Sequence, residues 1–367
     1  MNKLVVGNLI HRPLRSLISA LAVAIEVIMI LSIAAIMLGM LNGSKTRTSG
    51  IGFDMFVRPS STNNFAALSS AATSVKVADV LAGLPHVAVA SPVNVQLTAG
   101  TALENIYGID FKTFDALKPF VFVAGRPFEA PDDAIVDDVF AASGGGHKVG
   151  DPIEILRHTF RICGIVEHGK GGRKFIPIMT MGEITNNPGK ASAFYVKTDD
   201  IKNQKLVKQE VLSTPGMQQY DVQTLDEWLS LMTPDHLPGF NIALRIVIGI
   251  AVVIGFLVTF QSMYTAVMER TREIGVLKSL GASRTYIVSV VLRETGLLAL
   301  TGIALGVGAT YLMRAIFHAR LPKLDFAVTP EWVGSAVAIA FLGAMLGALY
   351  PALKAARKDP TDALSYE

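Results

Sequence analysis

Four long runs of apolar residues divide the chain, and a stretch with mixed polar and apolar positions separates the first run from the second. About 20 helical residues cross the roughly 30 Å hydrocarbon core of a bilayer. A cleaved signal peptide has an apolar core of only about 7–15 residues, so we expect the longer first run to be retained. The pattern predicts transmembrane helices at residues 17–41, 241–268, 286–316 and 331–353.

The composition agrees with a chain that lies partly inside and partly outside a membrane. Of its 367 residues, 51% are hydrophobic and 17% are charged, which is unusual both for a soluble domain and for a chain embedded throughout. Residues 42–240 are numerous enough to bury a core without a disulfide, and the single Cys163 cannot form one within the chain. The net charge of +3 gives no indication of nucleic-acid binding.

Basic residues indicate the orientation of the chain. They occur in an amphipathic lead-in (1–16), in the segment 269–285 and in the tail 354–367. Because basic segments stay on the cytoplasmic side, we expect cytoplasmic N and C termini and an extracytoplasmic domain at 42–240. The lead-in is either a plain topogenic signal or an interfacial helix that also contacts a cytoplasmic partner.

The outer region is predicted to be a mixed α+β domain with a β-rich insert at about 118–190. Strands are expected where apolar and β-branched residues gather, and helices where a capping residue precedes an apolar periodicity. We expect strands at 54–58, 87–98, 104–109, 193–197 and 220–224, a helix at 72–83, a helix capped by Thr198 or Asp199 that ends near Ser213, and a helix at 226–232. We also expect a hairpin of 152–156 and 159–167 with its turn near 157–158.

Motifs of catalysis are missing from the sequence. The phosphate-loop pattern G-x-x-x-x-G-K-[ST] does not occur, the seven histidines lack metal-ligand spacing, and there is no G-x-S-x-G elbow. The glycine clusters 144–146 and 169–172 are expected to be flexible loops, and a binding role for Lys170, Arg173 and Lys174 is the weaker alternative. We therefore expect no enzyme activity, no metal and no cofactor in this chain.

Glu26 interrupts the first apolar run. It follows Arg15 by about 11 residues, which is roughly 16 Å along a helix and close to the bilayer midplane. Carboxylates at that depth are costly and usually face protein or water. Glu26 is therefore either a cavity-lining or coupling group, or a packing residue that is protonated or hydrogen-bonded to Thr259, Gln261 or Ser262.

Small residues spaced four apart occur in the last two apolar runs. Gly302 and Gly306 lie in one, and Gly343 and Gly347 lie in the other. This pattern lets helices approach closely. We expect packing within the chain more than a dimer interface.

A short charged segment separates the second and third apolar runs. Ile274, Leu277 and Leu280 are three apart and predict one apolar edge of a short helix, which Gly281 can end in the left-handed conformation. A helix this short is marginal alone, so its apolar edge needs a surface to pack on. That surface is either a partner or the membrane.

The sequence MERTREIGVLKSLGAS at 268–283 and the tail YPALKAARKDPTDAL at 350–364 resemble the signature segments of FtsX/MacB-type ABC transporter permeases. The lead-in NLIHRPLRSLISAL and the insert sequences KVGDPIEI and ICGIV are similar to that family as well. The resemblance implies a membrane α-helical protein with four transmembrane helices and a large α+β extracytoplasmic domain of the Porter/Sabre type.

The resemblance also implies a function. It suggests a mechanotransmission permease subunit of the bacterial cytoplasmic (inner) membrane, active in efflux or export. The implied partners are two ABC ATPase subunits that bind ATP and Mg, a second copy of this permease or a close paralogue, and a periplasmic membrane-fusion adaptor. The segment 269–285 would be the coupling helix loop. The implied ATPase contacts are Glu269, Arg270, Arg272, Glu273, Ile274, Leu277 and Lys278.

Other functions stay open at this point. They are the extraction or release of lipoproteins or lipids, the regulation of a cell-wall hydrolase during division, and a membrane receptor or scaffold without an ATPase. The large two-part outer domain favours transport over the division role. The sequence leaves open the cargo, its direction of movement, the adaptor, and whether the permease forms a homodimer or a heterodimer.

Overall fold

The computed structural model describes residues 13–60, 73–99, 103–143, 145–233, 240–320 and 324–357. The chain divides into two compact units, a helical unit formed by Met1–Met40 and Pro238–Glu367 and an outer unit formed by Leu41–Leu237. Residues 1–12 of the predicted lead-in, residues 358–367 of the predicted tail and Gly144 lie outside the described residues.

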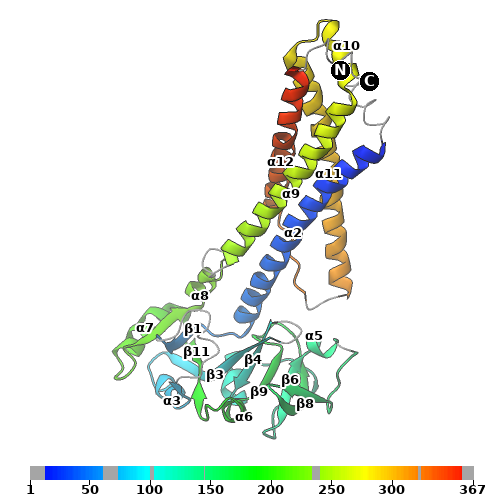
Figure 1. The fold of residues 1–367 in the computed structure, drawn as a ribbon. Coiled ribbons are helices and arrows are strands. Elements are labelled where there is room, and N and C mark those ends of the chain that lie inside the picture. Colours follow the sequence, from blue (N-terminus) through cyan, green and yellow to red (C-terminus); the bar gives the residue numbers. More distant parts are fainter. Residues whose placement is uncertain are drawn as a thin grey trace. The chain divides into compact units, whose positions relative to one another are not determined.

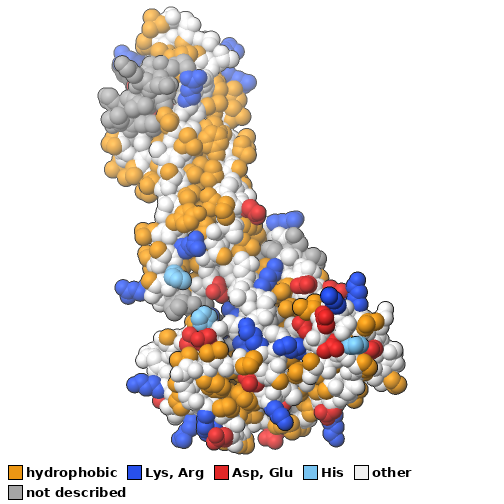
Figure 2. Space-filling view, turned by 180° about the vertical axis from the view of Figure 1, so that it is seen from behind, with side chains coloured by type: hydrophobic (Ala, Val, Ile, Leu, Met, Phe, Trp, Pro, Cys, Tyr) orange, Lys and Arg blue, Asp and Glu red, His pale blue; other side chains and the backbone are white. Residues whose placement is uncertain are grey.

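Four helices in the described residues are long and apolar enough to cross a membrane (Figure 1). They are α2 (Pro13–Gly50), α9 (Phe240–Glu269), α11 (Arg284–Arg320) and α12 (Pro330–Arg357). Their most apolar 18-residue windows have mean hydropathies of 2.7, 2.6, 1.7 and 2.0. Hydrophobic side chains cover the surface of the helical unit in Figure 2, as lipid contact requires. The predicted four membrane helices are confirmed.

Small residues bring these helices close together. On the buried face of α12, alanines recur every fourth residue, at Ala336, Ala340, Ala344, Ala348 and Ala352. A Cβ added to Gly302 would lie 2.5 Å from the Ala20 carbonyl oxygen of α2, and one on Gly306 would lie 2.8 Å from that of Ala24. Helices in lipid associate mainly through such close packing.

The other two glycines of the predicted pattern lie on α12. A Cβ on Gly347 would lie 2.9 Å from the Phe256 carbonyl oxygen of α9. One on Gly343 would meet only a Glu26 carboxylate oxygen, at the ordinary contact distance of 3.8 Å. Gly302, Gly306 and Gly347 therefore allow close backbone approach within the chain, whereas Gly343 has more room.

The outer unit is built on a 10-stranded mixed sheet with the strand order β12-β1-β11-β3-β4-β9-β6-β8-β5, and β7 pairs with β8. These strands are β1 (Met55–Pro59), β3 (Val87–Ala99), β4 (Leu103–Ile109), β5 (Phe122–Gly125), β6 (Asp133–Asp137), β7 (Pro152–Ile155), β8 (His158–Val166), β9 (Lys174–Pro177), β11 (Ala193–Thr198) and β12 (Tyr220–Thr224). The pair β2 (Thr73–Ser74) and β10 (Lys190–Ala191) forms a second small sheet.

Short helices cover this sheet. They are α3 (Val77–Ala82), α4 (Phe111–Leu117), α5 (Asp138–Ala141), α6 (Ile178–Ile184), α7 (Gln204–Ser213) and α8 (Leu225–Leu231), with a 3₁₀ turn, η2, at Ile201–Asn203. The architecture confirms the predicted membrane-helical protein with a large α+β outer domain.

Both faces of the sheet are buried near β1, which explains the continuous apolar run Met55–Val57 at its start. Met55 and Val57 pack with Val207 and Val211 of α7 on one face. Phe56 points to the other face, into an aromatic cluster. Successive strand residues point to opposite faces, so a strand covered on both sides has no polar alternation.

Two local predictions for the outer unit were wrong. A helix was expected at 72–83, but Thr73–Ser74 pairs with Lys190–Ala191 as a strand and the helix begins only at Val77. The helix expected to be capped by Thr198 or Asp199 begins at Gln204, and its N-cap residue Asn203 makes no side-chain cap bond. Asp200 caps the preceding 3₁₀ turn, where its carboxylate accepts from the Lys202 amide. Tertiary pairing outweighed local propensity in the first case, because β-branched Thr73 suits a strand.

The predicted hairpin of 152–156 and 159–167 is confirmed as β7 and β8. Its turn residues are Leu156 and Arg157, one position earlier than expected, because Ile155 pairs with His158. Both turn residues have positive φ, 53° and 64°. Two-residue hairpin loops use this backbone because it matches the strand twist, even where glycine is absent.

Close packing of α2 on α11 predicts a clear difference between two glycines of α11. Gly302→Ala should lower the free energy of unfolding by about 1–3 kcal/mol, because the added methyl group overlaps the α2 backbone. Gly308→Ala is the control, since nothing lies within 4 Å of its added Cβ. It should be neutral or slightly stabilising. Unfolding of the purified protein in detergent measures both, and equal effects would contradict the packing.

Candidate functional site

A short helix, α10 (Thr271–Ser279), joins α9 to α11 and lies at the end of the helical unit where α12 finishes (Figure 1). Helix α9 stops because Arg270 leaves the helical conformation, with φ −104° and ψ 16°. Helix α10 stops at Gly281, which has φ 92°. The Gly281 and Ala282 amides then bond to the carbonyls of Lys278 and Leu277. This left-handed ending is typical of glycine, as predicted.

A buried ion pair anchors the beginning of α10 to α11. The Arg270 guanidinium donates to both carboxylate oxygens of Glu294, at 3.2 and 3.0 Å. The two side chains are only 11% and 7% exposed. Charge-assisted bonds of this kind are strong, and they satisfy charges that burial would otherwise make costly. Arg270 was expected to contact an ATPase, but its side chain points into the bundle.

A second bond anchors the end of α10 to α12. Lys278 donates from Nζ to the carbonyl oxygen of Ala356, at 3.1 Å. Ala356 lies in the last turn of α12, where carbonyl groups lack helical partners. The cation also suits the negative end of the helix dipole. Lys278, another predicted ATPase contact, therefore holds two parts of this chain together.

Apolar packing fills the space under α10. Ile274 contacts a cluster that includes Val267 of α9, Ile287 of α11 and Ala355 of α12. Gly275 is buried on the same side. Together with the two polar anchors, this packing fixes α10 to all three neighbouring helices.

An outward stripe remains on the other side of α10. It consists of the exposed residues Glu269, Arg272, Glu273, Val276 and Leu280. Arg272 and Glu273 are adjacent, and each of the other three lies three or four positions from a neighbour in the set, close to the spacing of one helical face. Glu269 is the last residue of α9, and Leu280 follows the last residue of α10. Val276 is 43% exposed and Leu280 is 79% exposed. The stripe therefore combines two unburied apolar side chains with charges of both signs.

The predicted apolar edge is only partly outward. Leu280 belongs to the outward stripe, whereas Ile274 and Leu277 are half-buried against the bundle. Sequence reasoning missed Val276 and Glu294. The i, i+4 spacing of Val276 and Leu280 carried the signal for the former, but nothing local connects Glu294 to Arg270.

Glu26 is buried among the membrane helices and is 3% exposed. Its carboxylate oxygens have no hydrogen-bond partner. One of them occupies the space beside Gly255 of α9 that a Cβ would fill. The expected partners Thr259, Gln261 and Ser262 are therefore not bonded to it, and Ser262 lies in hydrogen-bond contact with Ser19 instead.

The basic residues near the second glycine cluster face inward. Lys170 is 7% exposed, lies 3.8 Å above the centre of the Phe120 ring and donates to the Lys118 carbonyl. Burial lowers the pKa of Lys170 to about 8. Arg173 pairs with Asp137 at 3.4 Å, and Lys174 pairs with Glu104 at 2.7 Å. Because each of the three has an internal partner, Lys170, Arg173 and Lys174 do not form an outward cluster of cations.

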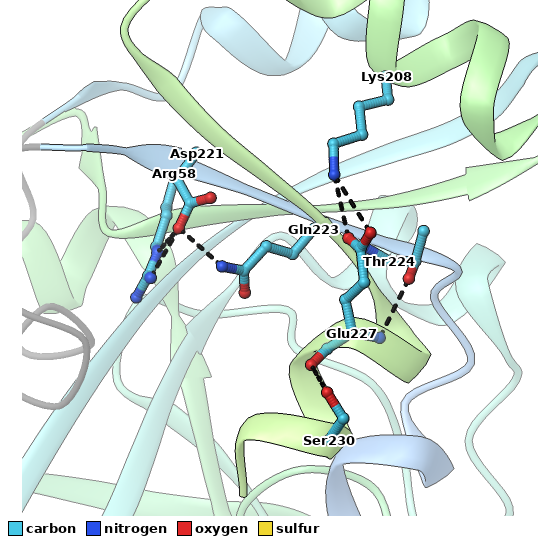
Figure 3. Close-up of polar contacts among 7 residues, drawn as sticks. All are labelled: Arg58, Lys208, Asp221, Gln223, Thr224, Glu227 and Ser230. Carbon is cyan, nitrogen blue, oxygen red and sulfur yellow. Dashed lines mark hydrogen bonds and ion pairs between the residues drawn. The ribbon is translucent and has the colours of Figure 1, made fainter. Parts of the chain in front are cut away.

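The outer unit holds its incoming and outgoing strands together (Figure 3). Strand β1 follows α2 and pairs with β12, which precedes α8 and α9. Arg58 of β1 is 2% exposed and donates to Asp221 of β12 at 2.7 Å. Gln223 donates to the same carboxylate oxygen at 3.0 Å. A half-buried charge pair thus joins the two strands by which the chain enters and leaves the sheet.

The start of α8 is fixed beside this pair. Thr224 and Glu227 form a capping box, in which each side chain accepts from the other residue's amide (Figure 3). Lys208 of α7 pairs with Glu227 at 3.1 Å. These capping and pairing contacts lower the pKa of Glu227. Such a cap fixes the direction in which the chain leaves the sheet.

The described part of the chain contains neither a metal-binding cluster nor a reactive cysteine. No three His, Cys, Asp or Glu side chains gather there in a group that could hold a metal ion. The Cys163 thiol is buried, and burial raises its pKa to about 12, so it is not a reactive thiolate.

Two known protein families match long segments of this sequence. Residues 245–360 match the family described as FtsX-like permease C-terminal, and residues 16–214 match the MacB-like periplasmic core domain. The second match alone spans more than half of the chain. The chain belongs to the FtsX/MacB-like ABC transporter permeases. In this permease, α10 lies within the FtsX-like segment and the ten-stranded sheet begins within the MacB-like segment.

Individual relatives agree with that family. The chain is 26% identical to the uncharacterized ABC transporter permease MJ1507 of Methanocaldococcus jannaschii, over 60% of this chain and 58% of the relative. It is 26% identical to the macrolide export ATP-binding/permease protein MacB of Chromobacterium violaceum, over 61% of this chain and 36% of the relative. It is 28% identical to the uncharacterized ABC transporter permease YknZ of Bacillus subtilis, over 59% of this chain and 55% of the relative. The matched part thus spans about a third to three fifths of these relatives.

The Arg270–Glu294 pair predicts a large loss of stability when one charge is removed. Arg270→Ala or Glu294→Ala should each lower the free energy of unfolding by about 3–5 kcal/mol, because the remaining charge is buried alone. The double variant Arg270→Met/Glu294→Leu should recover most of the loss. Arg272→Ala, on the exposed side, is the control and should change stability by less than about 0.5 kcal/mol. Unfolding in detergent provides the measurement, and additive effects in the double variant would count against the pair.

Burial of Lys170 predicts a pH-dependent stability. The folded pKa is about 8, and an unfolded lysine titrates near 10.4. Between these values only the unfolded chain binds the proton, so stability should rise as the pH increases from about 8 to about 10. Lys170→Met should be more stable at neutral pH and lose this rise, whereas the exposed control Lys202→Met should keep it. Denaturant unfolding followed by Trp228 fluorescence tests this, and an identical rise in both variants would refute it.

Proposed function

We propose that this chain is the permease subunit that converts ATP hydrolysis by a separate ATPase into motion of its extracytoplasmic domain. The observation that carries the proposal is the anchoring of α10. The Arg270–Glu294 pair, the Lys278–Ala356 bond and the Ile274 packing fix α10 to α9, α11 and α12. A force applied to α10 would therefore move the helices with it.

The outward stripe supplies the surface on which an ATPase would press. Val276 and Leu280 offer apolar contact, and Glu269, Arg272 and Glu273 surround them with charge. Protein interfaces combine a small apolar centre with a polar rim in this way. Because Arg270 and Lys278 have internal partners, we assign the ATPase contacts to the outward stripe and give Arg270 and Lys278 the role of anchors.

Two features support transmission to the outer domain. Helix α2 is continuous over 38 residues, which is longer than a bilayer core requires. Its last turn packs inside the outer unit, where the Gly171 amide donates to the Arg47 carbonyl at 2.8 Å and a Cβ on Gly50 would overlap the Gly169 carbonyl. A helix held at such a contact can push or pull the sheet.

The second feature is the junction of the two strands. Movement of α2 would enter the sheet through β1, and movement of α9 would enter through α8 and β12. The Arg58–Asp221 pair joins β1 and β12 directly, so the two inputs act on one place in the sheet. This arrangement favours mechanical transmission over a receptor that has no moving partner.

The proposal includes the cellular setting. The basic segment around α10 favours a cytoplasmic position for it, with both termini cytoplasmic in the bacterial inner membrane. We infer two ATPase subunits that bind ATP and Mg, a second copy of this permease or a close paralogue, and a periplasmic adaptor. The similarity to the macrolide export protein MacB favours efflux as the direction of transport.

This function predicts that a charge at the tip of the outward stripe will uncouple the complex. Leu280→Asp should weaken binding of the co-purified ATPase by roughly 30-fold, as expected for loss of an interface anchor. Its melting temperature should stay unchanged, because Leu280 is 79% exposed. Titration of the purified permease with the ATPase measures the affinity, and transport-linked ATP turnover in proteoliposomes should fall in parallel.

Ser283→Asp is the matched control. It adds the same charge to the same loop, and aspartate can replace Ser283 as the cap of the Tyr286 amide. This variant should bind the ATPase within about twofold of the unaltered chain. Unchanged affinity in Leu280→Asp would contradict the stripe as the contact surface. ATP turnover by the permease without any ATPase would contradict the assignment of hydrolysis to the partner.

A further inference from the structure

A large groove runs between α11 and α12 on the helical unit. Its volume is about 1040 Å³, near the upper limit of pockets that hold small organic ligands. It extends along α11 from Arg284 to Leu300, which is roughly 24 Å at 1.5 Å per residue. One leaflet with its headgroups is about half of the 40–45 Å total thickness of a bilayer. The groove therefore has the length of one leaflet.

Two arginines line one end of this groove, and a third lies near its middle. Arg284 begins α11 and Arg357 ends α12, and both line the groove at the end where α10 is found. Arg293 lines it about 14 Å further along α11. All three side chains are exposed. No acidic side chain is among the described residues that line the groove.

The rest of the lining suits hydrocarbon. Leu297 and Leu300 of α11 are 39% and 54% exposed, and Phe341 and Met345 of α12 lie across from them. Thr285 and Ser289 add hydroxyl groups near the arginines. The groove thus presents two guanidinium groups and two hydroxyl groups towards one end, a third guanidinium group near its middle, and apolar walls beyond it.

We propose that this groove is a binding site for an anionic phospholipid of the leaflet on the α10 side. The phosphate group would lie between Arg284 and Arg357, with hydrogen bonds from the guanidinium groups, and the acyl chains would lie along Leu297, Leu300 and Phe341. Basic pockets between membrane helices bind anionic headgroups for this reason. A second copy of this chain offers a weaker explanation, because copies related by symmetry would bring the same arginines near one another.

The site also touches the anchors of α10. Arg357 follows Ala356, whose carbonyl accepts from Lys278, and Arg293 precedes Glu294, which holds Arg270. A lipid bound across α11 and α12 would hold together the two helices to which α10 is anchored. The inference rests on the membrane helices and their charges and does not require the coupling role.

The test is lipid binding by the full-length protein, followed by native mass spectrometry. The protein in detergent is titrated with phosphatidylglycerol and, separately, with phosphatidylcholine of the same acyl chains. We expect tighter binding of phosphatidylglycerol. Arg284→Gln/Arg357→Gln should reduce that affinity by about 30-fold, since each arginine contributes roughly fivefold. Binding of phosphatidylcholine should change little.

Two further variants make the result specific. Arg314→Gln/Arg320→Gln removes two exposed arginines of the same helix that do not line the groove, and it should keep its phosphatidylglycerol affinity within about twofold. Ser289→Phe leaves the arginines in place but fills the groove, and it should also lose the lipid. Equal affinity for the two lipids, or retention by both groove variants, would overturn the proposal.

Disulfide cross-linking tests the alternative that a second copy of this chain occupies the groove. In a Cys163→Ala background, Val288→Cys places a thiol in the groove. A groove open to lipid should yield no disulfide-linked dimer in native membranes. Efficient cross-linking between two copies, with no lipid retained, would replace the lipid site with a contact between subunits.

Discussion

The buried pair of Arg270 and Glu294 is the interaction on which the rest of the account depends. Arg270 precedes α10 and Glu294 lies in α11, and burial would be costly for either charge alone. Their pairing determines which face of α10 turns towards the bundle. With Lys278 bonded at the other end of the helix, α10 cannot rotate or tilt without breaking a charged contact. The outward stripe is then the face that remains available to a partner.

Under the proposed function, motion of α10 would pass directly to the helices that anchor it. Close packing of glycine and alanine couples the membrane helices, because their backbones approach too closely to slide independently. Glu26 is an exception, since its buried carboxyl has no hydrogen-bond partner and lies between α9 and α12. A group like this makes tight closure of those helices less favourable. Within the outer unit, the Arg58–Asp221 pair joins β1 and β12, the strands that follow α2 and precede α8.

The sequence predicted the features that depend on local pattern, and it failed where distant residues decide. The apolar runs predicted the four membrane helices, and Gly281 predicted the end of α10, because each of these features depends on residues that are close in sequence. The inward role of Arg270 could not be predicted, since Glu294 is 24 residues away and no periodicity links them. Ile274, Leu277 and Leu280 fit both an inward and an outward edge, and only packing on three helices distinguishes the two. Thr73–Ser74 likewise depends on pairing with residues more than a hundred positions later.

The central claim is that the outward stripe of α10 is a cytoplasmic surface covered by an ATPase. It is tested most directly by labelling Leu280→Cys in a Cys163→Ala background with a membrane-impermeant maleimide. The account predicts no labelling in intact spheroplasts, rapid labelling in inside-out vesicles stripped of the ATPase, and protection when the ATPase is added back. Labelling from outside intact spheroplasts, or no protection by a bound ATPase, would contradict it.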